Sequence, residues 1–372
     1  MVSSCRSSRR ATFHPPSTPK SENPDLKAVP VQDWSKLPPE SAYFLSVDRG
    51  KRSLGINLKT KEGQDIVRDL VKEADVLIEN YLPGKLGEMR LGYDVCKAIN
   101  PKLIYASITG YGQTGPYSAH PGYDVMIEAE AGLMHITGEK ESTPVKVGVA
   151  ITDLTTGIYA YSAILAALYG RKSTGRGVHI DASLFESQIA SLANIGSNYL
   201  IAGQEAERQG TAHPSIVPYQ TVPTRDGWLM LGAGNDSQFV VLSRILGQDW
   251  PSDPLFSTNS ARVANRQRLI SEMSDVLRMK SIDGWLEPLS GKGLPFAPIN
   301  NIQKTFEHPQ AIARKVVVAV EHPRTGKIKL AAPVIAYDGE KMQITKPPPV
   351  LGQHTLEVLR EDLGLDDSFI AE

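Results

Sequence analysis

Cysteine is nearly absent from this chain, in which Cys5 and Cys96 are the only two among 372 residues. Two cysteines that far apart provide no disulfide framework, and they favour a reducing compartment. An excess of either charge is also missing, because 40 Lys and Arg residues are balanced by 41 Asp and Glu residues, for a net charge of -1. Such a balance gives no general attraction to nucleic acid or to an anionic membrane, so neither is expected as a partner.

Long apolar runs and the common cofactor motifs are missing too. The longest apolar helix indicated by the pattern covers about 158–170, which is too short to span a bilayer. The chain has no Walker-type phosphate loop, His-Glu-x-x-His, Cys-x-x-Cys or Gly-x-Ser-x-Gly motif. Its histidines His135, His179 and His354 have no partners at metal-ligand spacing. We therefore expect no bound metal and no permanently bound cofactor.

Strand and helix patterns alternate along much of the chain. Apolar residues at helical spacing in 61–74 precede a short strand at 76–78, and similar pairs follow at 93–108 and 178–199. This alternation predicts an α/β fold with a parallel sheet covered by helices. The length indicates two domains. The expected boundaries are a divergent, disordered or transit-like segment at 1–34, a large domain at 35–215, a small domain at 216–318 and a return segment at 319–372.

Asp153 stands out because of its position. It follows the apolar segment 145–151, which predicts a strand, and precedes an apolar-faced helix predicted to begin at Leu154. Asp153 would then be the N-cap of this helix, where backbone N–H groups and the helix dipole lower the pKa of its carboxyl group. Taken alone, the position is explained by a simple cap; a carboxylate that acts as a nucleophile is the alternative.

The surrounding motifs decide between these interpretations by resemblance. Gly-Tyr-Asp at 122–124, Gly-Leu-Met-His-Ile-Thr-Gly at 132–138, Pro-Val-Lys-Val-Gly-Val-Ala at 144–150 and Asp-Leu-Thr-Thr-Gly at 153–157 resemble the core of the family III (CaiB/BaiF) CoA-transferases. Segments 48–53, 74–84, 107–117, 232–236, 295–300 and 351–355 extend the resemblance to roughly nine-tenths of the chain. It implies a Rossmann-like large domain, a smaller α/β domain and an interlocked homodimer.

The resemblance also implies a reaction. Asp153 would be the nucleophile that carries CoA as an aspartyl-CoA thioester, from a dicarboxylyl-CoA such as succinyl-CoA to a carboxylic acid acceptor of the glutarate or hydroxymethylglutarate type. Segments 132–138 and 232–236 fit the branch that uses succinate and hydroxymethylglutarate. Covalent catalysis of this kind divides one difficult transfer into easier steps, so the partners are small molecules and the CoA thioester is a substrate.

Further site residues follow from matching positions in the family. A glycine-rich loop that would close over the intermediate and donate N–H groups to an oxyanion consists of Gly232, Ala233, Gly234 and Asn235. The first turn of the helix after Asp153 is a second source of such donors. The positions that match CoA contacts are Ile56, Lys59, Asn80, Tyr81, Tyr123 and Asp124. A phenol is a poor base at neutral pH, so Tyr123 favours transfer over the racemase or epimerase chemistry known in the same superfamily, which remains an alternative.

The chain departs from the family pattern in two places. Glu88 stands where relatives carry an arginine, and Arg90 two positions later faces elsewhere on a helix. The usual first strand, with its polar loop and arginine, has no counterpart in 1–34. A truncated protein that binds CoA or dimerises without efficient turnover is therefore a third interpretation.

The first twenty residues resemble a mitochondrial transit peptide in their basic and Ser-rich composition. Arg6, Arg9, Arg10 and Lys20 occur there without an acidic residue, although Pro15, Pro16 and Pro19 shorten any helix. The location expected is mitochondrial, or otherwise cytoplasmic.

Overall fold

The computed structural model describes Ser3–Cys5 and residues 40–366. The expectation of a disordered or transit-like segment at 1–34 concerns residues that, apart from Ser3–Cys5, lie outside this part of the chain. The chain divides into two compact units. Unit 1 comprises Met1–Gly122, Leu154–Ser187 and Phe306–Glu372, and unit 2 comprises Tyr123–Asp153 and Gln188–Thr305. The domain boundaries drawn from the sequence stay a prediction.

Unit 1 is built on a four-stranded sheet in the order β1-β2-β3-β4. The strands are β1 (Ser3–Cys5), β2 (Val76–Glu79), β3 (Ile104–Thr109) and β4 (His179–Ser183). β2, β3 and β4 run parallel, with Val76 opposite Ile104 and Tyr105 opposite His179, whereas β1 is antiparallel to β2. The expected α/β fold with a parallel sheet is confirmed.

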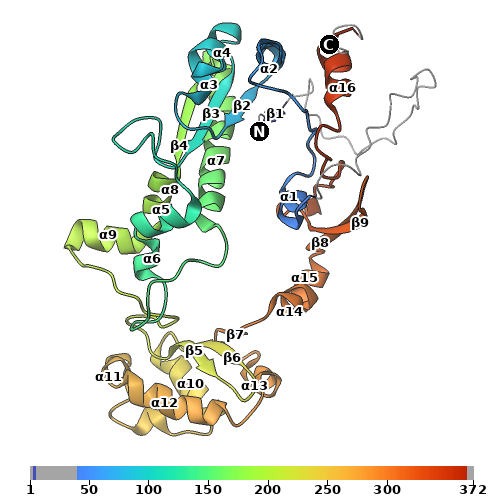
Figure 1. Ribbon diagram of the computed structural model, residues 1–372. Coiled ribbons are helices and arrows are strands. Elements are labelled where there is room, and N and C mark those ends of the chain that lie inside the picture. Colours follow the sequence, from blue (N-terminus) through green and yellow to red (C-terminus); the bar gives the residue numbers. More distant parts are fainter. Residues whose placement is uncertain (1–2, 6–39, 367–372) are drawn as a thin grey trace. The chain divides into compact units, whose positions relative to one another are not determined.

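Helices cover both faces of this sheet. Side chains alternate along each strand, so apolar residues of one strand pack against helices on both sides. Leu77 and Tyr105 pack with α2 (Lys61–Glu73), α3 (Lys85–Glu88) and α4 (Tyr93–Ile99). Val76, Ile104 and Ala106 pack on the other face against Ile164 of α7 (Ile151–Thr174), which Figure 1 shows running alongside the strands. The sequence patterns at 61–74 and 93–99 predicted α2 and α4 correctly.

The C-terminal part of unit 1 is held to the segment that precedes α2. The Gly50 N–H donates to Lys346 O at 3.0 Å, and the His354 N–H donates to Ser53 O at 2.9 Å. Arg52 forms ion pairs with Glu357 and Asp362. The remaining elements of unit 1 are α1 (Ala42–Val47), α15 (Pro309–Ala313), β8 (Val317–His322), β9 (Gly326–Ala331), β10 (Ala336–Tyr337), β11 (Glu340–Lys341), α16 (Thr355–Glu357) and a π-helical turn (Val358–Asp362). The helices α8 (Leu184–Ser191) and α14 (Ile302–Glu307) have residues in both units.

Unit 2 has its own sheet and its own core. The antiparallel strands β5 (Tyr219–Pro223), β6 (Trp228–Gly232) and β7 (Phe296–Pro298) form a sheet in that order. Leu229 and Leu231 point into a buried cluster with Phe239, Leu269 and Trp285. The helices of this unit are α5 (Asp124–Glu130), α6 (Leu133–Ile136), α9 (Ala193–Ala202), α10 (Asp236–Ile245), α11 (Asn259–Ala264), α12 (Arg266–Leu277) and α13 (Ile282–Leu289), with a 3-10 turn at Trp250–Ser252.

The structure corrects two expectations around Asp153. Residues 145–150 form no strand, because the Val147 N–H donates to the Glu128 side chain and not to a neighbouring strand. α7 begins at Ile151, so Asp153 is its third residue and not its N-cap. The helix of the strand and helix pair predicted at 178–199 is also broken, into α8 (Leu184–Ser191) and α9 (Ala193–Ala202), and Ala193 at the break has a positive φ of 47°.

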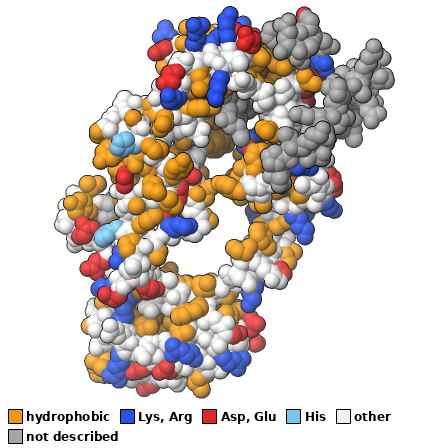
Figure 2. Space-filling model, in the orientation of Figure 1, with side chains coloured by type: hydrophobic (Ala, Val, Ile, Leu, Met, Phe, Trp, Pro, Cys, Tyr) orange, Lys and Arg blue, Asp and Glu red, His pale blue; other side chains and the backbone are white. Residues whose placement is uncertain are grey.

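α7 is longer than the sequence pattern indicated. It has 24 residues and is long and apolar enough to cross a membrane by length and composition alone, so the expectation that it is too short was wrong. Its inner face packs on the sheet through Ile164 and Leu168, while Ile158 and Tyr161 are exposed. Over the face in Figure 2, acidic and basic side chains are interspersed.

Candidate active site

The N-terminus of α7 is capped by a carboxylate from another helix. Asp124, the first residue of α5, accepts hydrogen bonds at Oδ1 from the backbone N–H groups of Thr152 (2.8 Å) and Asp153 (3.2 Å). A capping carboxylate satisfies N–H groups that have no partner within the helix, and it stabilises the helix through the dipole. Because Asp124 takes this role, the carboxyl group of Asp153 is not needed as a cap. It projects from the first turn and is exposed.

This arrangement reverses the expected pKa shift of Asp153. The sequence predicted a lowered pKa. Partial desolvation of the Asp153 side chain, which remains exposed, instead raises the pKa of its carboxyl group above the ordinary value, and the charge of Asp124 raises it further. A carboxylate with a raised pKa is a stronger base than an ordinary one. The shift therefore makes the Asp153 anion a better nucleophile.

Buried polar side chains hold the first turn of α7 in place. The Thr152 hydroxyl donates to Gln188 Oε1 at 2.7 Å, and both side chains are buried. Glu128 lies one turn after Asp124 on α5, is completely buried and accepts the Val147 N–H at Oε2 (3.0 Å). α5 thus holds the chain at Val147 and again at Thr152 and Asp153. The motif reasoning did not find Glu128; its signal is the four-residue spacing from Asp124, which places both on one helical face.

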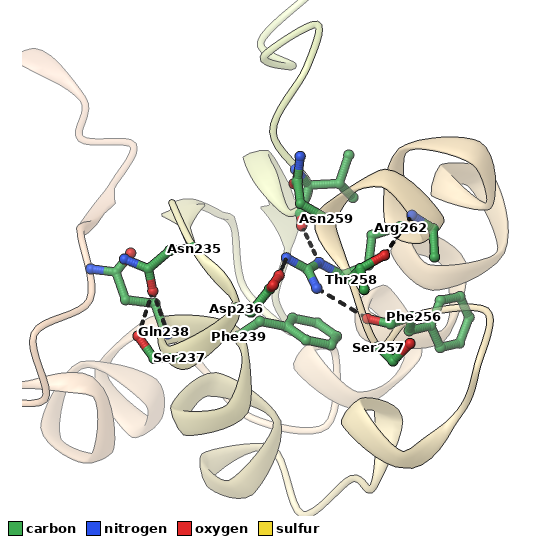
Figure 3. Close-up of polar contacts among 12 residues, drawn as sticks. Asn235, Asp236, Ser237, Gln238, Phe239, Phe256, Ser257, Thr258, Asn259 and Arg262 are labelled. Atoms are coloured by element: carbon green, nitrogen blue, oxygen red, sulfur yellow. Dashed lines mark hydrogen bonds and ion pairs between the residues drawn. The ribbon is translucent and has the colours of Figure 1, made fainter.

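The glycine-rich loop at Gly232–Asn235 ends β6 and leads into α10. A Cβ at Gly232 would lie 2.7 Å from the Tyr219 ring, so the loop requires glycine there. The Gly232 N–H donates to Pro295 O, and the Ala233 N–H donates to Pro218 O. Asn235 is the N-cap of α10 and accepts the Gln238 N–H at 2.9 Å (Figure 3).

Gln238 closes this loop. Its Oε1 accepts the Gly234 N–H at 2.7 Å, and its Nε2 donates to Gly293 O at 2.7 Å. In this conformation the N–H groups of Gly232, Ala233 and Gly234 are therefore all bonded within the protein. Stabilisation of an oxyanion by Gly234 would require the bond to Gln238 to open.

A buried arginine anchors the start of α10. Arg262 is fully buried and donates to Val217 O (2.7 Å), Phe256 O (3.0 Å) and Asp236 Oδ1 (2.8 Å), and its guanidinium lies 4.3 Å from the centre of the Phe239 ring. Figure 3 shows Arg262 directed at Asp236, the residue that follows the glycine-rich loop. Sequence reasoning had no signal for this contact, because the partners come from three separate segments.

The predicted CoA contacts fall into both units. In unit 1, Ile56 and Tyr81 pack against the core cluster of α2–α4. Lys59 and Asn80, which are close to them in the sequence, are exposed. The Tyr81 N–H donates to Glu79 Oε2 at 2.8 Å, which shapes the turn after β2. In unit 2, the side chain of Tyr123 is 70% exposed beside Asp124. The role of these residues in binding CoA stays a prediction.

The structure shows the surroundings of Glu88, which stands where relatives carry an arginine. Glu88 pairs with Lys85 at 3.1 Å on the surface of α3. Arg90 lies beyond the end of α3 with a positive φ of 55°, so it does not continue the helical face. Arg90 therefore does not take the place of the arginine that relatives carry at the position of Glu88.

His179 and His354 make structural contacts. His179 stacks on Tyr93 and bonds to the Ser107 hydroxyl at 2.9 Å, and His354 Nδ1 accepts the Ser53 N–H at 3.1 Å. Among the residues that the structure describes, no group of three or more His, Cys, Asp or Glu side chains could hold a metal ion.

Comparison with known proteins identifies the relatives of this chain. The model of CoA-transferase family III matches residues 22–355. The human succinyl-CoA:glutarate CoA-transferase is 47% identical over 90% of this chain and 76% of its own length. The succinate–glutarate CoA-transferase of Agrobacterium fabrum is 43% identical over 86% of this chain and 80% of its own length.

A solved structure agrees with these relatives. The crystal structure of a CaiB/BaiF family protein from Brucella suis superimposes with a TM-score of 0.80 at 42% identity, and the match covers 86% of this chain and 84% of that one. Family model, sequence identity and fold lead to the same conclusion. The chain belongs to CoA-transferase family III and is a CoA-transferase that uses CoA thioesters as substrates.

Proposed function

We propose that this enzyme transfers CoA from succinyl-CoA to glutarate, with Asp153 as the nucleophile. The observation that carries the proposal is the geometry at α7, where Asp124 caps the helix and leaves the Asp153 carboxyl group exposed with a raised pKa. The choice of substrates rests on the names of the human and Agrobacterium relatives.

The reaction proceeds by carboxylate and thiolate attack. An oxygen of the Asp153 carboxylate attacks the succinyl-CoA thioester carbonyl, forming an aspartyl–succinyl anhydride and releasing the CoA thiolate. The thiolate then attacks the aspartyl carbonyl, which expels succinate and forms the aspartyl-CoA thioester. Glutarate attacks this thioester, and the released thiolate attacks the glutaryl carbonyl of the second anhydride. Glutaryl-CoA leaves and the Asp153 carboxylate is restored. Every acyl bond that breaks is replaced by another of similar energy, so the reaction needs no ATP.

The remaining site residues support this path. Tetrahedral intermediates carry an oxyanion that N–H donors stabilise, and the loop Gly232–Asn235 is proposed to supply them when the bond between Gly234 and Gln238 opens. Asp124 already takes the Thr152 and Asp153 N–H groups, so the loop is the better source. Ile56, Lys59, Asn80, Tyr81 and Tyr123 are proposed to contact CoA.

The chemistry can be tested by trapping the intermediate. Purified enzyme is mixed with succinyl-CoA without acceptor, and its intact mass is measured before and after addition of hydroxylamine. We expect a CoA adduct at Asp153 that hydroxylamine removes, and no adduct on Asp153→Ala. Glutarate is then added to a second sample; formation of glutaryl-CoA by enzyme that shows no adduct, or turnover by Asp153→Ala, contradicts the proposal.

We also propose that the enzyme is a homodimer that buries the outer face of α7. This face carries Ile158, Tyr161, Leu165 and Tyr169, which are 65, 60, 47 and 76% exposed, while the opposite face packs on the sheet. A helix that is apolar on both faces is normally buried on both. A second copy is the proposed cover, in keeping with the interlocked dimer that the family resemblance implied.

A mitochondrial location is proposed from the sequence of the first twenty residues. Its support is the basic, Ser-containing and acid-free composition around Arg6, Arg9 and Arg10. A fusion of residues 1–40 to a fluorescent protein tests this directly, and diffuse fluorescence outside mitochondria contradicts it.

A further inference from the structure

Three carboxyl groups gather at the N-terminus of α7, all within unit 2. Asp124 and Glu128 lie one helical turn apart on α5, and the Asp153 N–H bonds to Asp124. Asp124 and Asp153 have roles in the proposed reaction. Glu128 has none so far, although it is the most buried of the three.

The surroundings of Glu128 do not suit an ionised carboxylate. The residue is 0% exposed, and a buried charge without a partner is strongly destabilising. Its Oε2 accepts the Val147 N–H, but its buried Oε1 has no hydrogen-bond donor among the described residues. Asp124 lies one helical turn before Glu128 on the same face of α5, and it is one of the groups that raise the pKa of the Glu128 carboxyl group. Two ionised carboxylates cannot bond to each other, because both only accept; a proton on one of them creates the missing donor.

The charges that act on Glu128 favour the protonated form. Burial raises the pKa of the Glu128 carboxyl group; the Val147 N–H opposes this, Asp124 raises the pKa further, and Lys146 lowers it. Lys146 is the cation on the segment packed against α5, and its side chain is exposed to solvent, which weakens its effect. Asp124 in turn accepts hydrogen bonds at Oδ1 from two backbone N–H groups at the α7 N-terminus.

We propose that Glu128 is a positioning residue that stays protonated in the working enzyme and donates its proton from Oε1 to the carboxylate of Asp124. The inference rests on the proposed nucleophilic role of Asp153. The shared proton orients Asp124 so that Oδ1 faces the Thr152 and Asp153 N–H groups. It also lowers the charge of the three carboxyl groups from −3 to −2 when Asp153 is ionised, so that Asp153 is kept as the anion that the attack requires.

The protonation state can be measured without substrate. Infrared difference spectra of wild type minus Glu128→Gln at about pH 7 are compared with wild type minus Glu141→Gln, since Glu141 is exposed in the same unit. We expect the carbonyl stretch of a protonated carboxylic acid in the first difference only. A carboxylate signal in its place overturns the proposal.

The dependence of stability on pH provides a second test. A carboxyl group whose pKa is raised in the folded state stabilises the fold below its unfolded value of 4.5, and this contribution is lost as the pH rises through the folded pKa. Glutamine does not titrate. The melting temperature of Glu128→Gln should therefore rise relative to wild type between about pH 5 and pH 8, whereas Glu141→Gln should follow wild type. A Glu128→Gln variant that loses stability relative to wild type over this range overturns the proposal.

Activity separates this inference from the proposed function. Glu128→Gln reproduces the neutral donor and should keep kcat within about threefold, whereas Glu128→Ala removes the donor and should lower kcat about tenfold with a smaller effect on KM. Equal losses in both variants overturn the positioning role. If Asp153→Ala still turns over while the infrared signal is present, the proposed function fails and the protonated Glu128 stands. If Asp153→Ala is inactive and the signal is absent, only this inference fails.

Discussion

The backbone N–H of Asp153 donates to Asp124 Oδ1 at 3.2 Å, so the proposed nucleophile lies on a helix that is capped by a second carboxylate. The cap stabilises the first turn of α7. Partial desolvation raises the pKa of the Asp153 carboxyl group, and the charge of Asp124 raises it further. One contact therefore positions the nucleophile and adds to its basicity. Most of the following predictions depend on contacts of this kind.

Removal of the nucleophile should abolish transfer without unfolding the protein. Asp153→Ala is expected to lower kcat by at least about a thousandfold, as losses of covalent nucleophiles do. Because Asp153 is exposed, the melting temperature should hardly change. Steady-state transfer from succinyl-CoA to glutarate measures the effect, and a variant that keeps a tenth of the activity would exclude Asp153 as the nucleophile.

Neutralisation of Asp124 should shift the pH dependence of the reaction. In Asp124→Asn the side-chain oxygen can still accept the Thr152 and Asp153 N–H groups, but the charge that raises the pKa of Asp153 is lost. The pKa of Asp153 should fall, so the acid limb of kcat/KM moves to lower pH, by up to about one unit. The wild-type profile is the reference, and a shift to higher pH would contradict the pairing.

Loss of Gln238 should release the glycine-rich loop. Gln238→Ala removes the acceptor of the Gly234 N–H and the bond to Gly293 O, so the Gly234 amide should exchange with deuterium roughly fivefold faster. Ser237→Ala is the matched control, because the Ser237 hydroxyl bonds only to Asn235 Oδ1 in the contacts described for it. Equal exchange in both variants would show that Gln238 does not hold the loop.

Truncation of Arg262 should destabilise unit 2. Arg262→Ala leaves the buried carbonyls of Val217 and Phe256 without their donor and opens a cavity beside Phe239, for a loss of about 3 kcal/mol in the free energy of unfolding. Arg268→Ala is the control: it breaks the ion pair between Arg268 and Glu272, half-exposed on the surface, and should cost less than about 1 kcal/mol. Urea unfolding compares the two, and similar losses would contradict the anchoring role.

A charge on the outer face of α7 should prevent self-association. Leu165→Glu places a carboxylate in the face that includes Ile158 and Tyr161, so the dimer should dissociate at micromolar protein concentration. Ile302→Glu changes an even more exposed apolar residue outside α7 and should leave the mass in solution unchanged. Sedimentation analysis measures the molecular mass in solution, and a Leu165→Glu protein that remains dimeric would exclude this face as the interface.

Local patterns predicted much of the fold. Alternation of apolar helices and strands located α2, β2, α4, β3 and β4 within a few residues, because each buries one face or both faces against its neighbours. The same patterns failed at 145–151. This segment is apolar enough for a strand, but its hydrogen bonds go to a side chain on α5, which local sequence does not reveal.

The identity of the candidate nucleophile was available from the sequence, since motifs around 122–124, 132–138 and 153–157 resemble one enzyme family. Its chemical environment was not. Three features depend on the contact between α5 and the start of α7: the direction of the Asp153 pKa shift, the cap supplied by Asp124 and the burial of Glu128. In this contact Asp124 bonds to Thr152, which lies 28 residues later in the sequence. Sequence determines which groups are present and their local periodicity. Only the tertiary structure decides which charges lie close enough to act on one another, because electrostatic and hydrogen-bond energies depend on distance in space.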